Sequence, residues 1–363
     1  MAQKVIFIVG AILAVPSFIF LLAFSLQEPE SLQFKTLRHA ERGIYITHNI
    51  AQLPVRFKYL RDEAKKCNIN TLVIDLKPLL SKPILALAKD HKMNSSYQVV
   101  PDPKVTKMIA QLHEEGFIVS ARIPVFKDDW LAIYRPDLAL PYRDRKGGRW
   151  LNPYKAEARL YNELIAAAAA ASGADEVQFD YIRFPAEGDL GRLTFSSQET
   201  GGLSKVDVIC LFLKEVKERL KNKKTSMAVD IFGVVAWQYK GDIDTLGQDL
   251  KKMAPYLEIL SPMLYPSHFH PGYDGYSNPG SEPYYFMNMG VVKSLEILSG
   301  EAVQLAPWLQ AFNMNSPNYG PEYIRQQVKA CTDAGVNYYL FWNASNNYDV
   351  VFAALRKQGL ANK

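Results

Sequence analysis

Short apolar runs rich in β-branched and aromatic residues alternate eight times with helical patterns along this chain, and no other feature constrains its fold as strongly. Strands that alternate with helices pair in parallel, because each helix carries the chain back before the next strand begins. Eight such units suit a closed barrel, so we predict an α/β protein with a (β/α)₈ (TIM) barrel. An open doubly wound sheet is the alternative. It usually has a glycine-rich turn after its first strand, whereas residues 47–49 here read Thr-His-Asn.

The individual elements follow from the apolar runs and from the prolines and glycines that bound the helices. We predict strands over residues 43–47, 71–76, 118–124, 176–183, 225–232, 258–265, 303–309 and 338–343. We predict helices over residues 55–67, 103–115, 154–172, 205–220, 243–253, 286–298, 321–334 and 349–357. The long connections all follow strands, over residues 78–102, 125–153, 185–204 and 266–285. They would gather at the C-terminal rim of the barrel, where such enzymes carry their sites.

The N-terminus predicts a location for this barrel. Residues 5–24 are apolar and uncharged and follow Lys4, and about 20 such residues suffice to cross a bilayer. We predict a membrane anchor or a signal segment over 1–25, a linker over 26–41 and the barrel domain over 42–363. The barrel would then be membrane-anchored on the extracytoplasmic side, or secreted.

The fourth predicted strand places a carboxylate among apolar residues near its carboxyl end. Side chains alternate between the two faces of a strand, so Asp180 shares a face with Gln178 while Phe179 points the other way. A carboxylate in such surroundings is costly unless it is paired or functional. Asp180 is therefore the first catalytic candidate, and a purely structural ion pair with Arg122 or Arg183 is the alternative.

Asp230 lies at an equivalent depth on the next predicted strand. Neighbouring strands are about 4.8 Å apart, so Asp180 and Asp230 can form the carboxylate pair that glycoside hydrolysis needs. Asp180 would be the nucleophile or charge stabiliser and Asp230 the acid, unless Asp230 is a helix cap or a hydrogen-bonding support. Asp75, on the second strand, is a third candidate, or a structural partner of Arg122 or Lys77.

The tryptophans all lie at or just beyond the predicted carboxyl ends of strands, at positions 130, 150, 237, 308 and 342. Aromatic faces at a cleft rim suit the apolar faces of sugar rings, although core packing is the alternative for any single tryptophan. Polar residues near the same ends could bond sugar hydroxyls. The predicted substrate-binding residues are Asp75, Arg122, Trp150, Arg183, Tyr265, His268, Trp308, Gln310, Trp342 and Asn343.

Several classes of partner and cofactor are not expected. The formal charge of +5 is spread over 42 basic and 37 acidic residues, and the densest basic stretch, 214–224, has glutamates at helical spacing, so we expect no nucleic-acid partner. There is no P-loop, GxSxG or HExxH motif. His268 and His270 could offer a metal two ligands, but no third Cys or His stands near them, so we expect neither a metal nor another cofactor.

Several segments resemble a bacterial family described as glycoside hydrolases and long catalogued as a domain of unknown function. They read RIPVFKDDWLA, GGRWLNPYKAEARLYN, GADEVQFDYIRFP, SPMLYPSHFHPGYDGYSNPGSEPY, PWLQAF and LFWNASNNY, and the similarity runs from about residue 42 to the C-terminus. The resemblance implies a TIM barrel distantly related to amylase-type glycosidases. It also implies that Asp180 occupies the position of the amylase nucleophile.

The chain departs from the amylase pattern at three places. Asp230 stands on the strand that supplies the acid, which is a glutamate in amylases, and Gln310 stands where a third aspartate would be. After Lys77 the chain lacks the acidic, glycine-containing run that members of the family tend to have. We predict a glycosidase that acts on an extracytoplasmic polysaccharide. A non-catalytic carbohydrate-binding barrel is the second hypothesis, and a barrel lyase or deacetylase-like enzyme is the third.

Overall fold

The computed structural model describes residues 41–144, 146–188 and 190–356. The apolar segment 5–24 and the linker up to residue 40 lie outside the described residues, so the expected anchor or signal stays a prediction. None of the described helices is both long enough and apolar enough to cross a bilayer.

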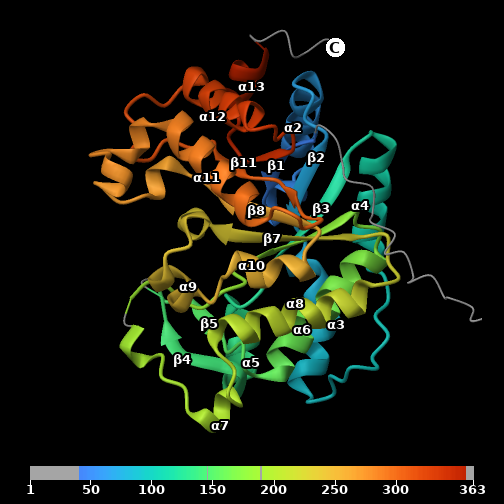
Figure 1. The fold of residues 1–363 in the computed structure, drawn as a ribbon. Coiled ribbons are helices and arrows are strands. Elements are labelled where there is room, and N and C mark those ends of the chain that lie inside the picture. The colour runs from blue at the N-terminus through green and yellow to red at the C-terminus, as the bar shows by residue number, and fades with distance from the viewer. Residues whose placement is uncertain (1–40, 145, 189, 357–363) are drawn as a thin grey trace, which may run out of the picture. The chain divides into compact units, whose positions relative to one another are not determined.

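In the part of the chain that the structure describes, eight parallel strands close into a barrel (Figure 1). The strands are β1 (Arg42–Ile46), β2 (Thr71–Asp75), β3 (Ile118–Pro124), β6 (Glu176–Asp180), β7 (Ser226–Phe232), β8 (Ile259–Met263), the broken strand β9 (Gln304–Leu305) and β10 (Trp308–Gln310), and β11 (Tyr339–Trp342). The ring is closed because β1 pairs with both β2 and β11, and β10 pairs with both β8 and β11. The predicted barrel is confirmed.

Long helices pack around the barrel, and shorter helices lie in the loops that follow the strands. They are α1 (His48–Ala51), α2 (Pro54–Lys66), α3 (Lys77–Lys89), α4 (Pro103–Glu114), α5 (Asp129–Tyr134), α6 (Ala156–Ala171), α7 (Ser197–Thr200), α8 (Lys205–Leu220), α9 (Lys240–Leu246), α10 (Leu250–Met253), α11 (Pro283–Ile297), α12 (Pro321–Asp333) and α13 (Asp349–Arg356). Neighbours pack in chain order, α3 on α6, α6 on α8, and α11 on α12 (Figure 1). Capping residues in the sequence determine where several of these helices begin. For example, the Ser204 side chain accepts from the N–H of Asp207, whose carboxylate accepts from the N–H of Ser204.

Apolar residues form two cores, one between the strands and the helices and one inside the barrel. The outer core holds residues such as Ile44, Val119 and Phe212, all fully buried. The inner core is smaller and includes Tyr45, Val73, Ala228, Ile259, Trp308, Tyr338 and Leu340. Polar side chains share the barrel interior with these residues, and the candidate site is built from them.

The segments that were expected to be loops contain regular structure, most of it in the first two of them. Helix α3 fills the first half of the predicted loop 78–102, and its buried residues Leu80, Ile84 and Ala88 repeat at the spacing of one helical turn. The predicted loop 125–153 contains α5 and a hairpin of β4 (Ala139–Arg143) and β5 (Arg149–Leu151). Helix α3 was not predicted because the sequence has prolines at positions 78 and 83, which usually interrupt helices. The first of them falls in the opening turn, where proline is favoured.

A buried ion pair joins the start of α3 to Asp128, the N-cap residue of α5 in the segment that follows β3. The ammonium group of Lys77 lies 2.7 Å from Oδ2 of Asp128, and both side chains are under one tenth exposed. The same ammonium donates to Oδ1 of Asn162 on α6 at 2.9 Å and to the carbonyl group of Pro124 on β3. We infer that this contact fastens α3 to the barrel.

Replacing Lys77 by methionine is expected to lower the free energy of unfolding by about 3–5 kcal/mol, because Asp128 would be left buried without a counter-charge. Urea denaturation followed by circular dichroism measures this change. The matched control is Lys58→Met, which removes an exposed pair with Asp62 and should cost less than about 0.5 kcal/mol. Equal losses for the two variants would contradict the fastening role of Lys77.

Candidate active site

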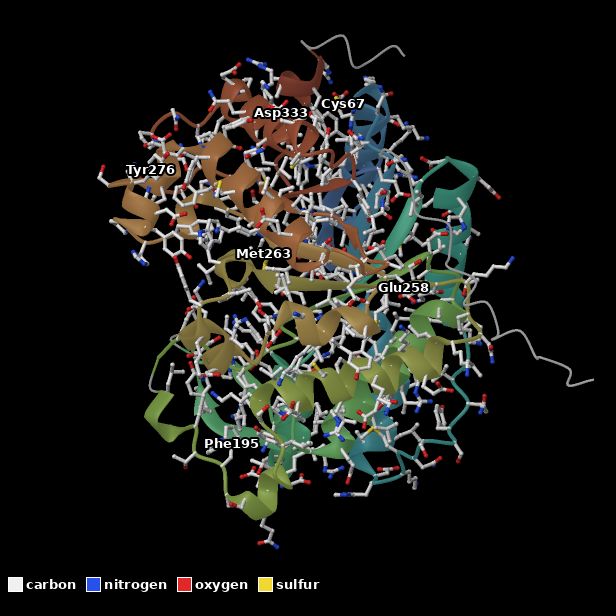
Figure 2. The ribbon with its side chains drawn as sticks, in the orientation of Figure 1. Cys67, Phe195, Glu258, Met263, Tyr276 and Asp333 are labelled. Atoms are coloured by element: carbon white, nitrogen blue, oxygen red, sulfur yellow. The ribbon has the colours of Figure 1, made fainter. Side chains whose placement is uncertain are left out.

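A cavity of about 390 Å³ opens at the carboxyl ends of the barrel strands. Its lining includes the last residues of four strands, Asp180 of β6, Phe232 of β7, Met263 of β8 and Trp342 of β11. Figure 2 labels Met263, which ends β8, and Glu258, which directly precedes that strand, so the cavity lies at the Met263 end. This is the C-terminal rim, where barrel enzymes carry their active sites.

Asp180 is held by the guanidinium of Arg122. Nη2 of Arg122 donates to Oδ2 of Asp180, and Nη1 donates to Oδ1 of Asp75 at 2.5 Å. The strand register explains both contacts, because Arg122 lies opposite Asp75 on one side and opposite Gln178, two residues before Asp180, on the other. The hydroxyl of Tyr45 donates to the second oxygen of Asp75. One guanidinium therefore joins two carboxylates across three strands.

Both carboxylates keep Arg122 charged. Burial by itself would lower the pKa of this guanidinium, but the charges of Asp75 and Asp180 outweigh it and raise the pKa well above its ordinary value. Charge-assisted hydrogen bonds of this kind are stronger than neutral ones, and each buried charge has a partner. Asp180 is thus paired with Arg122 and not with Arg183, the other partner that the sequence allowed.

The backbone after Asp180 is strained in a way that orients its side chain. Tyr181 has a φ of 52°, a left-handed conformation that costs a non-glycine residue roughly 1–3 kcal/mol. Its N–H donates to Oδ1 of Asp180 at 2.6 Å. The carbonyl groups of Asp180 and Tyr181 accept from the N–H groups of Val125 (2.7 Å) and Phe126 (3.2 Å). The segment that follows β3 therefore holds this turn in place.

Asp230 occupies a different environment on the next strand. Its side chain is only 2% exposed, and its Oδ1 accepts from Nε2 of Gln178 at 2.7 Å and from Nε1 of Trp308 at 2.6 Å. Burial, and then the nearby charge of Asp180, raise the pKa of Asp230 well above its ordinary value. Phe179 pairs with Val229, so one further residue places Asp180 opposite Asp230. The structure thus brings together two carboxyl groups with unlike environments.

Five of the predicted substrate-binding residues line the cavity. They are Trp150, Arg183, Tyr265, His268 and Trp342. Trp342 stacks on Tyr45 with ring centroids 4.0 Å apart. Aromatic surface thus lies on several sides of Asp180, as a site for sugar rings requires.

Three further predicted residues lie behind or beside this cavity. Arg122 is buried under Asp180, and Trp308 lies inside the barrel, where its indole donates to Asp230. Asp75 lines a neighbouring cavity of about 390 Å³ together with residues such as His48 and Trp130. None of these three residues lines the cavity that holds Asp180. Each acts on it through a contact: Arg122 with Asp180, Trp308 with Asp230, and Asp75 with Arg122.

The remaining two predicted residues brace the loops of the rim. Oε1 of Gln310 accepts from the N–H of Ser267 at 3.1 Å, and its Nε2 donates to the carbonyl of Phe312 at 2.9 Å. Asn343 donates to the carbonyl of Ala311 at 2.6 Å and accepts from the backbone of Ser345 at 2.9 Å. Neither Gln310 nor Asn343 lines the cavity that holds Asp180.

The cavity also contains residues that the sequence did not single out. Tyr142 lies on the unpredicted hairpin, and Asp144, just beyond β4, pairs with Lys127 at 2.6 Å. Glu187 belongs to the loop after β6 and is exposed. The length of the loop 125–153 was the signal that could have pointed to the first three residues, since long rim loops often carry binding groups.

The two neighbouring histidines point to different surroundings. His268 lines the cavity and packs against Tyr265 and Phe312, whereas His270 packs against Tyr273 and contacts the carbonyl of Pro271 at 3.0 Å. Across the described ranges, no group of three or more His, Cys, Asp or Glu side chains could hold a metal ion.

Residues 43–348 match the family whose description reads "Putative glycosyl hydrolase domain". The chain belongs to this family. The match covers most of the chain and confirms the resemblance seen in the sequence. No curated protein matches it.

Solved structures resemble the barrel of this family member. The glycoside hydrolase domain of PgaB (BpsB) from Bordetella bronchiseptica is 14% identical, with a TM-score of 0.58, and the match covers 88% of this chain and 98% of that one. The β-galactosidase of the psychrophilic Marinomonas ef1 is 12% identical, with a TM-score of 0.56, over 87% and 56%. A hypothetical protein from Ruminiclostridium thermocellum ATCC 27405 is 30% identical over 51% and 96%, with a TM-score of 0.41. The first two likenesses show the fold alone.

The raised pKa of Asp230 predicts how stability depends on pH. Above about pH 4 the unfolded chain releases this proton while the folded chain keeps it, so ionisation opposes folding increasingly as the pH rises toward the folded-state pKa. Asp230→Asn removes this penalty. Its free energy of unfolding, relative to that of the wild type, should therefore increase by up to about 1.4 kcal/mol per pH unit above pH 4. Urea denaturation between pH 4 and 7 measures the trend, and a constant difference between the two proteins would contradict it.

Proposed function

We propose that this family member hydrolyses glycosidic bonds in a polysaccharide outside the cytoplasm. The observation that carries the proposal is the pair formed by Asp180, ion-paired with Arg122 at the cavity, and Asp230, whose environment favours its protonated form. Two neighbouring carboxyl groups in unlike environments, one ion-paired at the cavity and one buried among neutral donors, are the arrangement that an acid and a base need in one site. The extracytoplasmic location rests on the apolar segment 5–24 alone.

Asp180 would act in its ionised form. Its charge is balanced by Arg122, and its Oδ1 is held by the N–H of Tyr181. It is the last residue of β6 and lines the cavity, so a sugar ring bound there would meet it directly. A carboxylate in that position can attack the anomeric carbon or stabilise the positive charge that develops on it.

Asp230 would supply the proton for the leaving oxygen. Both of its hydrogen bonds end on Oδ1, so the proton belongs on Oδ2. Burial and the charge of Asp180 raise its pKa, as a general acid working near neutral pH requires. Asp230 lies under the cavity wall, so the leaving oxygen would have to enter deeply, close to Asp180.

The strand register supports a retaining mechanism. Asp180 and Asp230 lie side by side at the same level of neighbouring strands, and such strands are about 4.8 Å apart. Retaining glycosidases keep their two carboxyl groups about 5–5.5 Å apart, whereas inverting enzymes leave roughly 6.5–9.5 Å for a water molecule. The closer spacing favours direct attack by Asp180 and a covalent intermediate.

A carbohydrate-binding module without catalysis is the second candidate. The burial of Asp230 beneath the cavity favours it, because an acid that cannot reach the substrate leaves only a binding site. Such a protein would bind glycans through the aromatic rim and cleave none of them. Comparing binding with turnover on the same glycans decides between the two candidates.

Asp180→Asn is expected to lower kcat by about 10⁴-fold while sparing glycan binding, because the amide can neither attack the sugar nor offset its charge. Release of reducing ends measures turnover, and calorimetry measures binding. The matched control is Asp90→Asn, which alters an exposed pair with Lys92 away from the cavity lining and should keep full activity. Retained hydrolysis by Asp180→Asn would show that another residue performs this role.

The register also predicts the stereochemistry of the product. Hydrolysis should release sugar with the anomeric configuration of the substrate, because two displacements occur at the same carbon. Proton NMR recorded in the first minutes of the reaction, before mutarotation, distinguishes the two anomers. An inverted product would mean that the carboxyl pair is spaced for a water molecule.

A further inference from the structure

Arg183 is a buried cation without a carboxylate partner. It follows β6 by three residues, its side chain is 5% exposed, and it lines the cavity. Among the described residues its guanidinium has one hydrogen bond, from Nη1 to the carbonyl of Phe184 at 2.9 Å, and no ion pair. Aromatic rings surround it, with centroids 4.0 Å away for Phe232, 4.9 Å for Trp150 and 5.4 Å for Tyr181.

The other buried arginines of the described chain are all paired. Arg122 contacts two aspartates, Arg135 contacts Asp137 and Glu157, and Arg159 contacts Glu215 at 2.7 Å. A buried guanidinium without a counter-charge is costly, and burial lowers the pKa of Arg183. Arg183 is therefore the exception, and it is also the buried arginine that lines the cavity.

Unpartnered polar atoms border the same cavity. The hydroxyls of Tyr142 and Tyr265 and the indole N–H of Trp150 are buried, and none has a hydrogen-bond partner among the described residues. Each of these atoms can donate a hydrogen bond, and an unsatisfied buried donor is rare in a native protein. Together with Arg183 they form a set of unsatisfied donors on residues of one cavity lining, which a ligand rich in acceptors would satisfy.

Of the two basic residues Lys127 and Arg183 in the cavity lining, Arg183 is the one without an ion pair among the described residues. Lys127 pairs with Asp144, and Asp180 shares the guanidinium of Arg122 with Asp75. Glu187 also belongs to the lining, but it is exposed and has no ion pair with any described residue. Arg183 and Glu187 are thus the charged lining residues without an ion pair in the described chain, and of the two Arg183 is the buried one.

We propose that this cavity binds a sugar unit that carries a carboxylate, so that the substrate is a polysaccharide containing uronic acid. The guanidinium offers a planar fork of donors that matches the two oxygens of a carboxylate. Tyr142, Tyr265 and Trp150 bond the remaining oxygens of the same unit. The inference rests on the proposed function for cleavage, although binding tests it independently.

The test uses polyuronates of several linkages, each compared with the same polymer after chemical reduction of its carboxyl groups to alcohols. Calorimetry measures binding to the full chain, and reducing-end release measures cleavage. We expect the native polymers to bind about 10–100-fold more tightly than their reduced counterparts. Arg183→Gln should remove this preference, Arg183→Lys should restore part of it, and Arg325→Gln, which alters a paired arginine on α12, should leave it unchanged.

Each outcome separates the inference from the proposed function. Cleavage of neutral glycans with no preference for carboxylates overturns the inference and leaves hydrolysis standing. Carboxylate binding that depends on Arg183 without any cleavage supports the inference and removes the proposed hydrolysis. A preference for sulfated over carboxylated glycans, or no binding to any polyuronate, overturns the carboxylate assignment.

Near-ultraviolet circular dichroism establishes whether each variant is folded. If Arg183→Gln is not folded, Arg183→Lys serves as the test variant.

Discussion

The bridge that Arg122 makes between Asp75 and Asp180 is the interaction on which the candidate site depends. Two carboxylates inside a barrel would repel each other and lose hydration, and a single guanidinium between them offsets both costs. It also ties β2, β3 and β6 together at the end where the cavity opens. The stability of the rim and the position of the Asp180 carboxylate thus depend on the same side chain.

The environments of Asp230 and Asp180 differ because Asp230 lies deeper inside the barrel, and not because the two residues stand at different levels of their strands. Both stand at corresponding places on adjacent strands, yet Asp180 meets a cation and the cavity, whereas Asp230 meets Gln178 and Trp308 inside the barrel. The neutral donors reduce the cost of burying Asp230 but do not balance a charge, so its protonated form is favoured. The barrel geometry thus gives two neighbouring carboxyl groups different environments, which is the difference that acid–base catalysis uses.

Much of the fold and part of the site could be predicted from the sequence. The eightfold alternation specifies a parallel barrel, and parallel strands end at one rim, so Asp180, Tyr265 and Trp342 had to lie near each other. Contacts made by long loops could not be predicted. The register of a strand predicts nothing about whether Gln310 and Asn343 turn toward the cavity, and in the structure both bind loop backbone instead. Tyr142 and Asp144 were missed because the hairpin around them has no strong periodic pattern.

Arg183 shows how pairing in the folded chain changes the meaning of a sequence motif. In the run DYIRFP the nearest carboxylate along the chain is Asp180, three residues away, and an ion pair between them would be a reasonable expectation. In the structure Asp180 pairs with Arg122 instead, because the strand register places that arginine beside it on the adjacent strand. After the turn at Tyr181, Arg183 packs against Phe232 and Trp150. Because Arg122 already holds Asp180, the guanidinium of Arg183 at the cavity wall has no carboxylate bound to it and is available to a ligand.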